Sequence, residues 1–309
     1  KLTRKQREDF MFMITTNLFL WEQRAASVWG DAMFSKAQFE ERYAVAYDEP
    51  FRPHRSIECT YRDAGHILGS AIIEITVQDE GRHKRLVASG DLGQPGRPIV
   101  RDPTPGRSAD AVLIEATYGD RPHRDLPATL IALEQVLSSA LRRGGNIVMP
   151  AFAVGRTQEV LYHLMQLARV GRLPPMQVFV DSPMAIAATE ITLRHAALFD
   201  EDARELDDWR RQGNGLARRR FAATAEESRA LNEIRGGAVI IAASGMCDAG
   251  RVKHHLRHNL RRRECSVLIT GFQAQGTLGR RLVDGARRVR IFGEEIPVHA
   301  SIHTLGGLS

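Results

Sequence analysis

The spacing of hydrophobic residues predicts helices first and strands next. In residues 1–47 apolar side chains recur every three or four positions, as at Phe10, Ile14, Leu18 and Trp21, which predicts helices. From residue 56 to residue 114 the residues alternate or form short apolar runs, which predicts strands at 56–61, 71–77, 85–88 and 111–114. Polar residues follow these strands, so we expect half of a layered sandwich with its functional groups along one edge.

After about residue 118, helices and short apolar strands alternate. Helices are predicted at 126–142, 155–167, 183–198 and 250–260, and strands at 146–149, 177–180, 238–243 and 266–270. A polar, charged stretch at 200–235 interrupts this order. Apolar strands that alternate with helices predict a mostly parallel sheet covered on both faces. We therefore expect a second domain, of the α/β class, inserted into the first.

Length and composition are those of a globular protein with two domains. The chain has 309 residues, of which 43% are hydrophobic, and this is enough for packed cores. Its net charge of +6 favours polyanionic partners without requiring one. The three cysteines form no C-x-x-C pair, and the most apolar early run, Phe10 to Trp21, is too short and interrupted to span a bilayer. We expect a cytoplasmic protein with no membrane partner.

A histidine and an aspartate stand just beyond two of the predicted strands. His66 lies in the loop before strand 71–77, and Asp91 follows strand 85–88. Nearby glycines let the backbone turn sharply and approach a bound group. Zinc takes imidazole and carboxylate ligands together, and a carboxylate can bridge two ions. The same residues also occur in ordinary turns, so their spacing leaves both a metal site and a structural turn open.

Longer motifs around these residues resemble one known family. The segments Asp63-Ala-Gly-His-Ile-Leu-Gly-Ser70, Ala88-Ser-Gly-Asp-Leu-Gly93 and Leu113-Ile-Glu-Ala-Thr-Tyr-Gly-Asp120 resemble the third and fourth metal motifs of the metallo-β-lactamase fold and the first motif of its β-CASP nuclease branch. Further matches follow in order at 150–159, 181–185, 244–246 and 303–307. The resemblance implies a partial metallo-β-lactamase αββα sandwich in residues 1–117, an inserted parallel-sheet β-CASP domain in 118–290, and a return to the first domain in 291–309.

This resemblance implies a metal-dependent ribonuclease that hydrolyses RNA phosphodiester bonds by a metal-activated hydroxide, with single-stranded RNA bound between the two domains. It implies two divalent metal ions, zinc being the expected one. His66 is then a metal ligand, and Asp91 is a catalytic residue that bridges the two ions. Glu115 is a catalytic acid that orients a catalytic group or a metal-ligating histidine. The alternative for Glu115 is a strand-end acid paired with a nearby arginine.

Three turns of the inserted domain are candidates for binding substrate phosphates. Helix N-termini present backbone amides and the positive end of the helix dipole, and both stabilise anions. In each turn the Ser or Thr fits an ordinary helix N-cap equally well. The candidate substrate-binding residues are Arg156, Thr157, Ser182, Ser244, Gly245, Arg251 and Gln273.

Two arginine runs and three histidines have simpler explanations. Residues 218–220 and 261–263 are typical of a solvated face, with attraction to phosphates as the alternative. His254, His255 and His258 have helical spacing but lack the carboxylate of a helix-borne zinc motif. They therefore predict a surface helix.

The most diagnostic element of the family is missing. None of the eleven histidines lies in a His-x-His-x-Asp-His turn, and the chain stops where the family pattern would next supply a catalytic histidine. A catalytic zinc ordinarily needs three protein ligands, so we expect the chain to be the interior of a longer protein and to be inactive by itself. The alternatives are an inactive RNA-binding scaffold, a DNA-directed nuclease of the same branch, and a hydrolase of small esters. A homodimer is left open.

Overall fold

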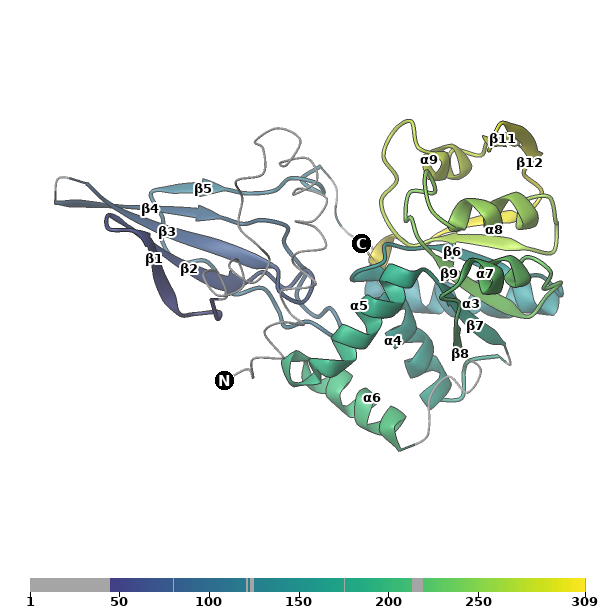
Figure 1. Cartoon of the computed structure of the whole chain (residues 1–309), viewed down its shortest axis with the longest axis horizontal. Helices are drawn as coiled ribbons and strands as arrows, with labels where there is room; N and C mark the ends of the chain where they lie inside the picture. The colour runs from purple at the N-terminus through teal and green to yellow at the C-terminus, as the bar shows by residue number, and fades with distance from the viewer. Residues whose placement is uncertain are drawn as a thin grey trace. The chain divides into compact units, whose positions relative to one another are not determined.

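A computed structural model describes residues 45–79, 81–120, 122, 125–174, 176–212 and 219–308 of the chain. The helices predicted before residue 45 lie outside these ranges, as does Arg218. The described residues form two compact units, whose elements are labelled in Figure 1. The first unit comprises the described part of 1–120 together with 191–204, and the second comprises that of 121–190 and 205–309.

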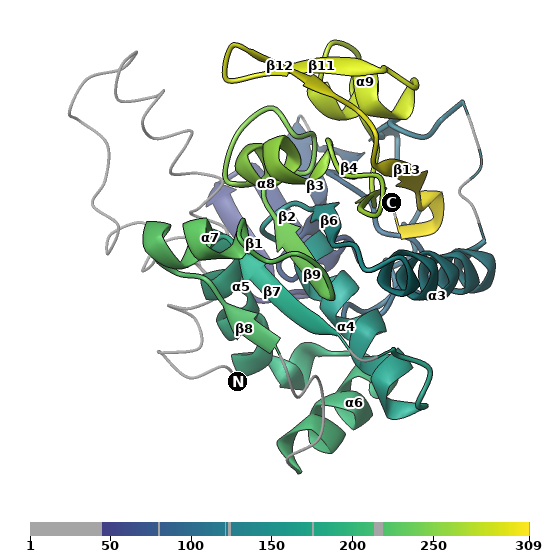
Figure 2. The same cartoon turned by 90° about the vertical axis from the view of Figure 1, so that its right-hand side faces the viewer.

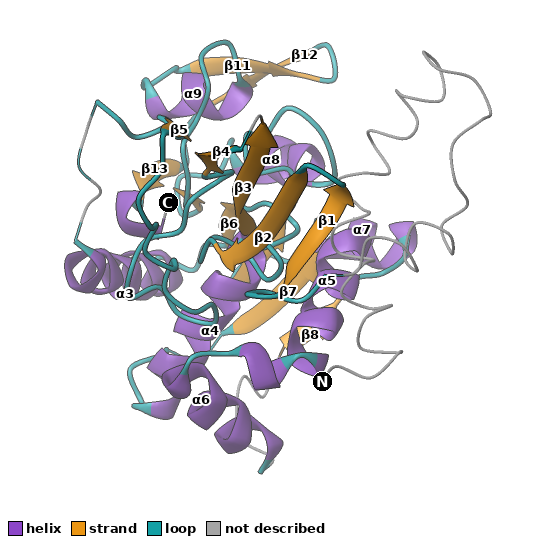
Figure 3. Cartoon of the chain, turned by 90° about the vertical axis from the view of Figure 1, so that its left-hand side faces the viewer, coloured by secondary structure: helices purple, strands orange, loops and turns teal. Residues whose placement is uncertain are grey.

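The first unit is built on a five-stranded sheet (Figure 3). Its strands, in spatial order, are β1 (Pro50–His54), β2 (Ile57–Asp63), β3 (Ala71–Asp79), β4 (Arg82–Ala88) and β5 (Ala111–Leu113). Strands β1 to β4 pair antiparallel, and β5 pairs parallel to β4. The predicted strands are therefore present, and one further strand, β1, precedes them.

Both faces of this sheet carry hydrophobic side chains, and one face also carries a buried ion-paired carboxylate. Alternation along paired strands places Tyr61 opposite Ile73, and Ile75 opposite Leu86, on one apolar face where these side chains are half-buried. On the opposite face the buried carboxylate of Glu74 is paired with two arginines from neighbouring strands, at 3.0 Å from Arg62 and 2.7 Å from Arg85. A charge buried in this way is tolerated because it is paired on both sides.

The second unit is built on a six-stranded sheet in which all strands are parallel (Figure 2). The spatial order is β13 (Ser301–Thr304), β10 (Ser266–Ile269), β6 (Ile147–Pro150), β9 (Ala238–Ala242), β7 (Gln177–Asp181) and β8 (Arg219–Phe221). A separate antiparallel hairpin is formed by β11 (Arg288–Ile291) and β12 (Glu294–Pro297).

Helices connect the parallel strands. They are α3 (Leu126–Arg142), α4 (Arg156–Arg169), α5 (Pro183–Arg194), α6 (Glu201–Arg211), α7 (Ala225–Leu231), α8 (Val252–Asn259) and α9 (Leu278–Val283), with short 3-10 turns at Ala196–Leu198 and Gly306–Leu308. The longest, α3, begins where the Asp125 carboxylate accepts a hydrogen bond from the Ala128 amide and ends shortly before Gly144, whose φ is +74°. None of the helices in the described ranges is long and apolar enough to cross a membrane.

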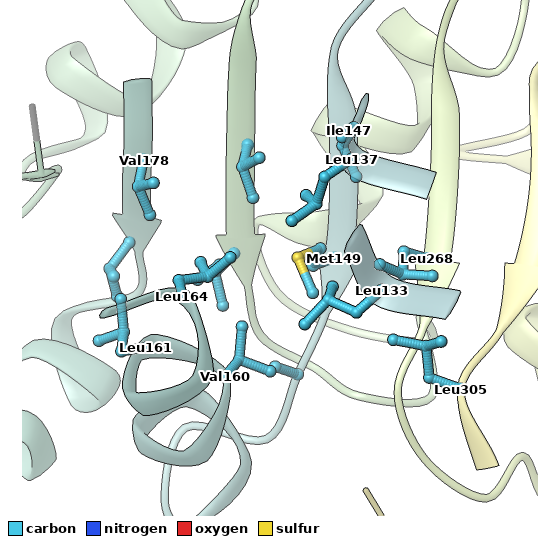
Figure 4. Close-up of a cluster of buried hydrophobic side chains, with 14 of the residues drawn as sticks. Leu133, Leu137, Ile147, Met149, Val160, Leu161, Leu164, Val178, Leu268 and Leu305 are labelled. Atoms are coloured by element: carbon cyan, nitrogen blue, oxygen red, sulfur yellow. The ribbon is translucent and has the colours of Figure 1, made fainter. Parts of the chain in front are cut away.

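Both faces of the parallel sheet are buried. Leu133 and Leu137 of α3 and Leu164 of α4 pack with Met149 of β6 on one face (Figure 4). Alternate strand residues, such as Val148 and Val267, pack on the other face with Leu256 of α8. The central strands are therefore apolar at almost every position, as expected for a parallel sheet between two helical layers. The predicted α/β class, with a parallel sheet covered by helices on both faces, is confirmed.

Two segments differ from expectation. The polar stretch 200–235 contains α6, β8 and α7, none of which was predicted. Helix α6 has no clear hydrophobic pattern, because most of its residues are charged and few of its side chains, such as Ala203 and Leu206, are buried. Residues 291–309 were expected to return to the first domain. Instead, β13 pairs with β10 at the edge of the second unit's sheet, where Ile302 packs against that unit's core.

Candidate active site

The loop that carries His66 is a closed turn between β2 and β3. The Asp63 carboxylate accepts a hydrogen bond from the Gly65 amide at 2.9 Å, and the Ser70 hydroxyl accepts from the amides of His66 and Ile67, each at 3.2 Å. Gly65 has φ +64°, a conformation that a residue with a side chain rarely adopts. The His66 side chain is exposed at this turn.

The loop that carries Asp91 lies directly against the His66 loop. The Gly93 amide donates to the Ala64 carbonyl at 2.8 Å, and a Cβ atom at Gly93 would lie 1.7 Å from the Gly65 carbonyl oxygen. The two backbones therefore touch at a point where a side chain has no room. Asp91 is exposed beside this contact. The glycines that the sequence places around His66 and Asp91 allow this close approach.

Glu115 joins the Asp91 loop to the third strand exit. Its carboxylate accepts from the amides of Leu92 at 3.1 Å and Thr117 at 3.2 Å, and its own amide donates to the Ser89 hydroxyl at 3.1 Å. Burial raises the pKa of Glu115, but hydrogen bonds from Thr117 and Leu92, together with nearby His66, outweigh it and leave the pKa below its ordinary value. The carboxylate is therefore held in its ionised form.

These contacts bring three strand-exit loops into one hydrogen-bonded group, which presents an imidazole and two carboxylates. A complete metal site is not formed by it. Within the described ranges, no three His, Cys, Asp or Glu side chains lie close enough together to hold an ion. A catalytic zinc ion ordinarily has three protein ligands, so the described residues do not by themselves fit the metal centre that the family implies.

In the second unit, two of the predicted substrate-binding residues lie at the start of α4. Thr157 is buried and donates its hydroxyl to the Phe152 carbonyl at 2.8 Å, so it closes the turn after β6. Arg156 pairs with Glu159 one turn along the helix, at 2.6 Å. The hydroxyl of Thr157 thus has a structural partner, and Arg156 is the more accessible of the two.

The predicted serines close the other turns at this edge of the sheet. Ser182 accepts a hydrogen bond from the Ala185 amide at 3.2 Å and caps α5. Ser244 exchanges hydrogen bonds with the backbone of Ala249, 3.3 Å from its carbonyl and 3.4 Å from its amide. Ser182 is therefore an ordinary helix N-cap, which was the alternative to a phosphate-binding role.

Gly245 and Gln273 are held together. The Gln273 amide nitrogen donates to the carbonyls of Gly245 at 3.0 Å, Gly271 at 3.2 Å and Phe272 at 3.0 Å, and its side chain is buried. A Cβ atom at Gly245 would lie 2.9 Å from the ring of Phe152. This close approach and the Gln273 hydrogen bonds together join the turns that follow β6, β9 and β10.

Arg251 is engaged within the second unit. It donates to the Asp181 carboxylate at 2.7 Å and to the carbonyls of Ala222 at 2.9 Å and Ala223 at 3.0 Å. These three bonds join the start of α8 to β7 and to the segment after β8. Its contact with substrate stays a prediction.

A buried polar network around Asp181 was missed. The Asp181 carboxylate lies 2.5 Å from the ring nitrogen Nε2 of His255 and accepts from the Ser228 hydroxyl at 2.6 Å, while Nδ1 of His255 faces the Asn232 side-chain oxygen at 3.0 Å. Burial raises the pKa of Asp181, but the hydrogen bonds from His255, Ser228 and Arg251 outweigh it and lower the pKa.

The prediction that all three histidines of α8 lie on a surface helix was wrong for His255, whose side chain is fully buried. A usable signal was present in the sequence. Val252, His255, Leu256 and Asn259 are all buried and recur at helical spacing, so His255 belongs to the inward stripe of α8.

Comparison with known proteins gives a consistent result. Residues 157–282 match the Beta-Casp domain. The chain is 39% identical over 254 residues to ribonuclease TTHA0252 of Thermus thermophilus, covering 82% of this chain and 58% of that protein. It is 29% identical over 260 residues to an RNase J-like protein of Methanocaldococcus jannaschii, covering 83% and 58%. It is 31% identical over 274 residues to transcription termination factor FttA of Methanosarcina mazei, covering 85% and 42%.

The chain thus spans 58% or less of the length of these relatives. The matched region includes most of the chain and extends well beyond the residues of the domain match. The parallel sheet, the glycine-dependent turns and these similarities agree, and residues 157–282 of the chain belong to the Beta-Casp domain family.

Proposed function

We propose that the full-length protein is a metal-dependent ribonuclease that hydrolyses phosphodiester bonds of single-stranded RNA. The observation that carries the proposal is the hydrogen-bonded group of strand-exit loops bearing His66, Asp91 and Glu115, in a chain 39% identical to a protein named as a ribonuclease. An inactive relative would have no functional reason to keep these three side chains in touching loops.

Within this proposal, Asp91 and Glu115 are catalytic residues, and His66 and Asp91 are metal ligands. The described residues do not complete a metal site, so the proposal requires further ligands from residues outside the described ranges of the full-length protein. We propose that the completed site of the full-length protein holds two zinc ions. The lowered pKa of Glu115 supports its role, because an ionised carboxylate can accept hydrogen bonds and orient a neighbouring imidazole near neutral pH.

Contact with the RNA backbone is assigned to the turns at the carboxyl edge of the parallel sheet, with Arg156 as the principal cation. Backbone amides at helix N-termini and the net charge of +6 both favour a polyanion there. The proposed location is the cytoplasm. A homodimer is a separate proposal, which sedimentation at micromolar concentration tests.

The test is cleavage of end-labelled single-stranded RNA and of DNA with the same sequence by the full-length protein, with and without a strong chelator. The variant is Asp91→Ala, and Asp208→Ala, at an exposed position on α6, is the matched control. We expect rapid RNA cleavage that chelator and Asp91→Ala abolish and Asp208→Ala leaves unchanged.

Other outcomes identify the alternatives. RNA cleavage that survives chelation, or that Asp91→Ala does not reduce, contradicts the proposed mechanism. RNA binding without cleavage by metal-loaded protein favours the inactive scaffold. Preferential cleavage of DNA favours the DNA-directed nuclease.

A further inference from the structure

Three large apolar side chains are exposed at one edge of the second unit's sheet. Phe152, Met184 and Phe272 expose 47%, 48% and 40% of their surface, respectively. They follow β6, β7 and β10 by two or three residues. Since all strands of this sheet run parallel, the three side chains stand at the same, carboxyl edge.

The strand order sets these side chains in a row. Strands β10 and β6 are neighbours, and β9 lies between β6 and β7. Phe272 and Phe152 therefore come from adjacent strands, about 4.8 Å apart in the hydrogen-bonding direction. Gly245, which follows β9, occupies the next position, and Met184 follows it.

Phe152 is seated by its neighbours. Its carbonyl accepts from the Thr157 hydroxyl at 2.8 Å and from the Thr157 amide at 3.2 Å. Its ring lies against the Cα atom of Gly245, where a Cβ atom would come within 2.9 Å of two ring carbons. The ring is therefore supported on one side by a residue without a side chain, while nearly half of the surface of Phe152 as a whole remains exposed.

Phe272 is connected to the same support. The buried side chain of Gln273 donates to the Phe272 carbonyl and also to the Gly245 carbonyl, both at 3.0 Å. Buried polar side chains thus fix the backbone on which both rings are carried. Thr157 and Gln273 were expected to bind substrate, but their side chains are buried in these contacts. The exposed groups beside them are the rings.

We propose that Phe152 and Phe272 form a stacking platform for the nucleobases of single-stranded RNA, with Met184 extending its apolar surface. The inference rests on the proposed RNA substrate and adds which residues hold its bases. The row alternates exposed apolar side chains with polar turns, and a single strand likewise alternates bases with phosphates. Aromatic stacking tolerates every base because each has a π face. The platform therefore binds unpaired RNA with little sequence preference.

The experiment measures binding of the metal-loaded full-length protein to a fluorescent single-stranded RNA octamer whose phosphorothioate linkages resist cleavage. The variants are Phe152→Ala and Phe272→Ala, with the matching Leu and Trp substitutions. Phe292→Ala is the control, because Phe292 is 52% exposed in the same unit but lies in the hairpin turn beside His254. Circular dichroism verifies that each variant is folded.

We expect each Ala variant at the platform to weaken RNA binding about 5-fold to about 150-fold, the range for loss of one base–aromatic stack. The Leu variants keep an apolar side chain but lack an aromatic ring, so they should also bind RNA more weakly. The Trp variants keep an aromatic ring and should bind RNA as tightly as wild type. Phe292→Ala should leave affinity within about 2-fold of wild type. An octamer of abasic ribose phosphates should bind wild type weakly, and the platform variants should bind it no more weakly than wild type does.

The contrary outcomes separate the two proposals. If wild-type protein binds no RNA, the proposed function fails. If it binds RNA and the platform variants bind equally well, the stacking platform alone is refuted. If the variants lose affinity for the abasic octamer and for RNA by the same factor, the rings only support the turns that contact phosphates and do not stack on bases. Full RNA affinity with Leu at both positions identifies an apolar contact with RNA that needs no aromatic ring, and also overturns the platform.

Discussion

Removing the charge of Asp181 should destabilise the second unit more than any exposed substitution. Asp181→Asn keeps the size of the side chain but leaves Arg251 without its counter-ion and places an amide among three donors, from Arg251, Ser228 and His255. Breaking a buried ion pair by removing one partner costs about 3–5 kcal/mol. Arg251 is 23% exposed, so water can solvate part of its charge, and we expect the lower end of that range.

The measurement is amide hydrogen exchange in peptides that cover β7 and β9, which reports the free energy of opening in this unit alone. Asp208→Asn is the matched control and should change that free energy by less than about 0.5 kcal/mol, because Asp208 is exposed. A change below about 1 kcal/mol for Asp181→Asn, or one equal to the control, would refute the reasoning.

The loss of opening free energy caused by Asp181→Asn should depend on pH in a direction that the pKa of Asp181 determines. The pKa of Asp181 is lower in the folded protein than its ordinary value of 3.8. A carboxylate with a lowered folded-state pKa contributes stability above the unfolded-state pKa, and the contribution is lost as pH falls through the folded-state pKa. The difference in opening free energy between wild type and Asp181→Asn should therefore shrink below pH 3.8. A difference that grows on acidification contradicts this account.

Three further predictions concern the strand-exit loops and the turn at α4. Gly93→Ala should separate the two touching loops and abolish RNA cleavage, because its Cβ atom would lie 1.7 Å from the Gly65 carbonyl oxygen, whereas Gly106→Ala, which meets nothing within 4 Å, should retain activity in the same assay. Glu115→Gln should reduce kcat at least about 10-fold with little change in RNA affinity, and the wild-type pH–rate profile should show no titration of this carboxylate above 4.5, because its pKa is lowered from that value. Thr157→Val should lower stability by about 1 kcal/mol in denaturant unfolding through loss of its 2.8 Å hydrogen bond, and Thr157→Ser should restore it; equal stability of the two variants would contradict a role for the hydroxyl.

The sequence predicted the parallel sheet because its central strands are apolar at almost every position and helices separate them. It also predicted which loops carry His66, Asp91 and Glu115, since glycines and polar residues follow alternating strands there. The catalytic roles of these residues stay predictions. Glycines at 65 and 93 indicated tight turns, but their mutual contact depends on tertiary structure.

The remaining features could not be derived from spacing. Asp181 and His255 are 74 positions apart, and no local pattern joins them. Phe152 and Phe272 would be assigned to the core by their hydrophobicity, yet the turns after their strands leave both rings exposed. Residues 301–304 form a strand because β10 offers an open edge, which is a property of the folded sheet.

The apolar face of the first unit's sheet has a practical consequence for protein engineering. This face carries four half-buried apolar side chains, those of Tyr61, Ile73, Ile75 and Leu86. A fragment that contains only residues 45–120 would therefore have an exposed hydrophobic surface and would aggregate at the concentrations used for purification. Threonine at positions 73 and 75 would keep the preference for extended backbone while making that surface more polar and the fragment more soluble.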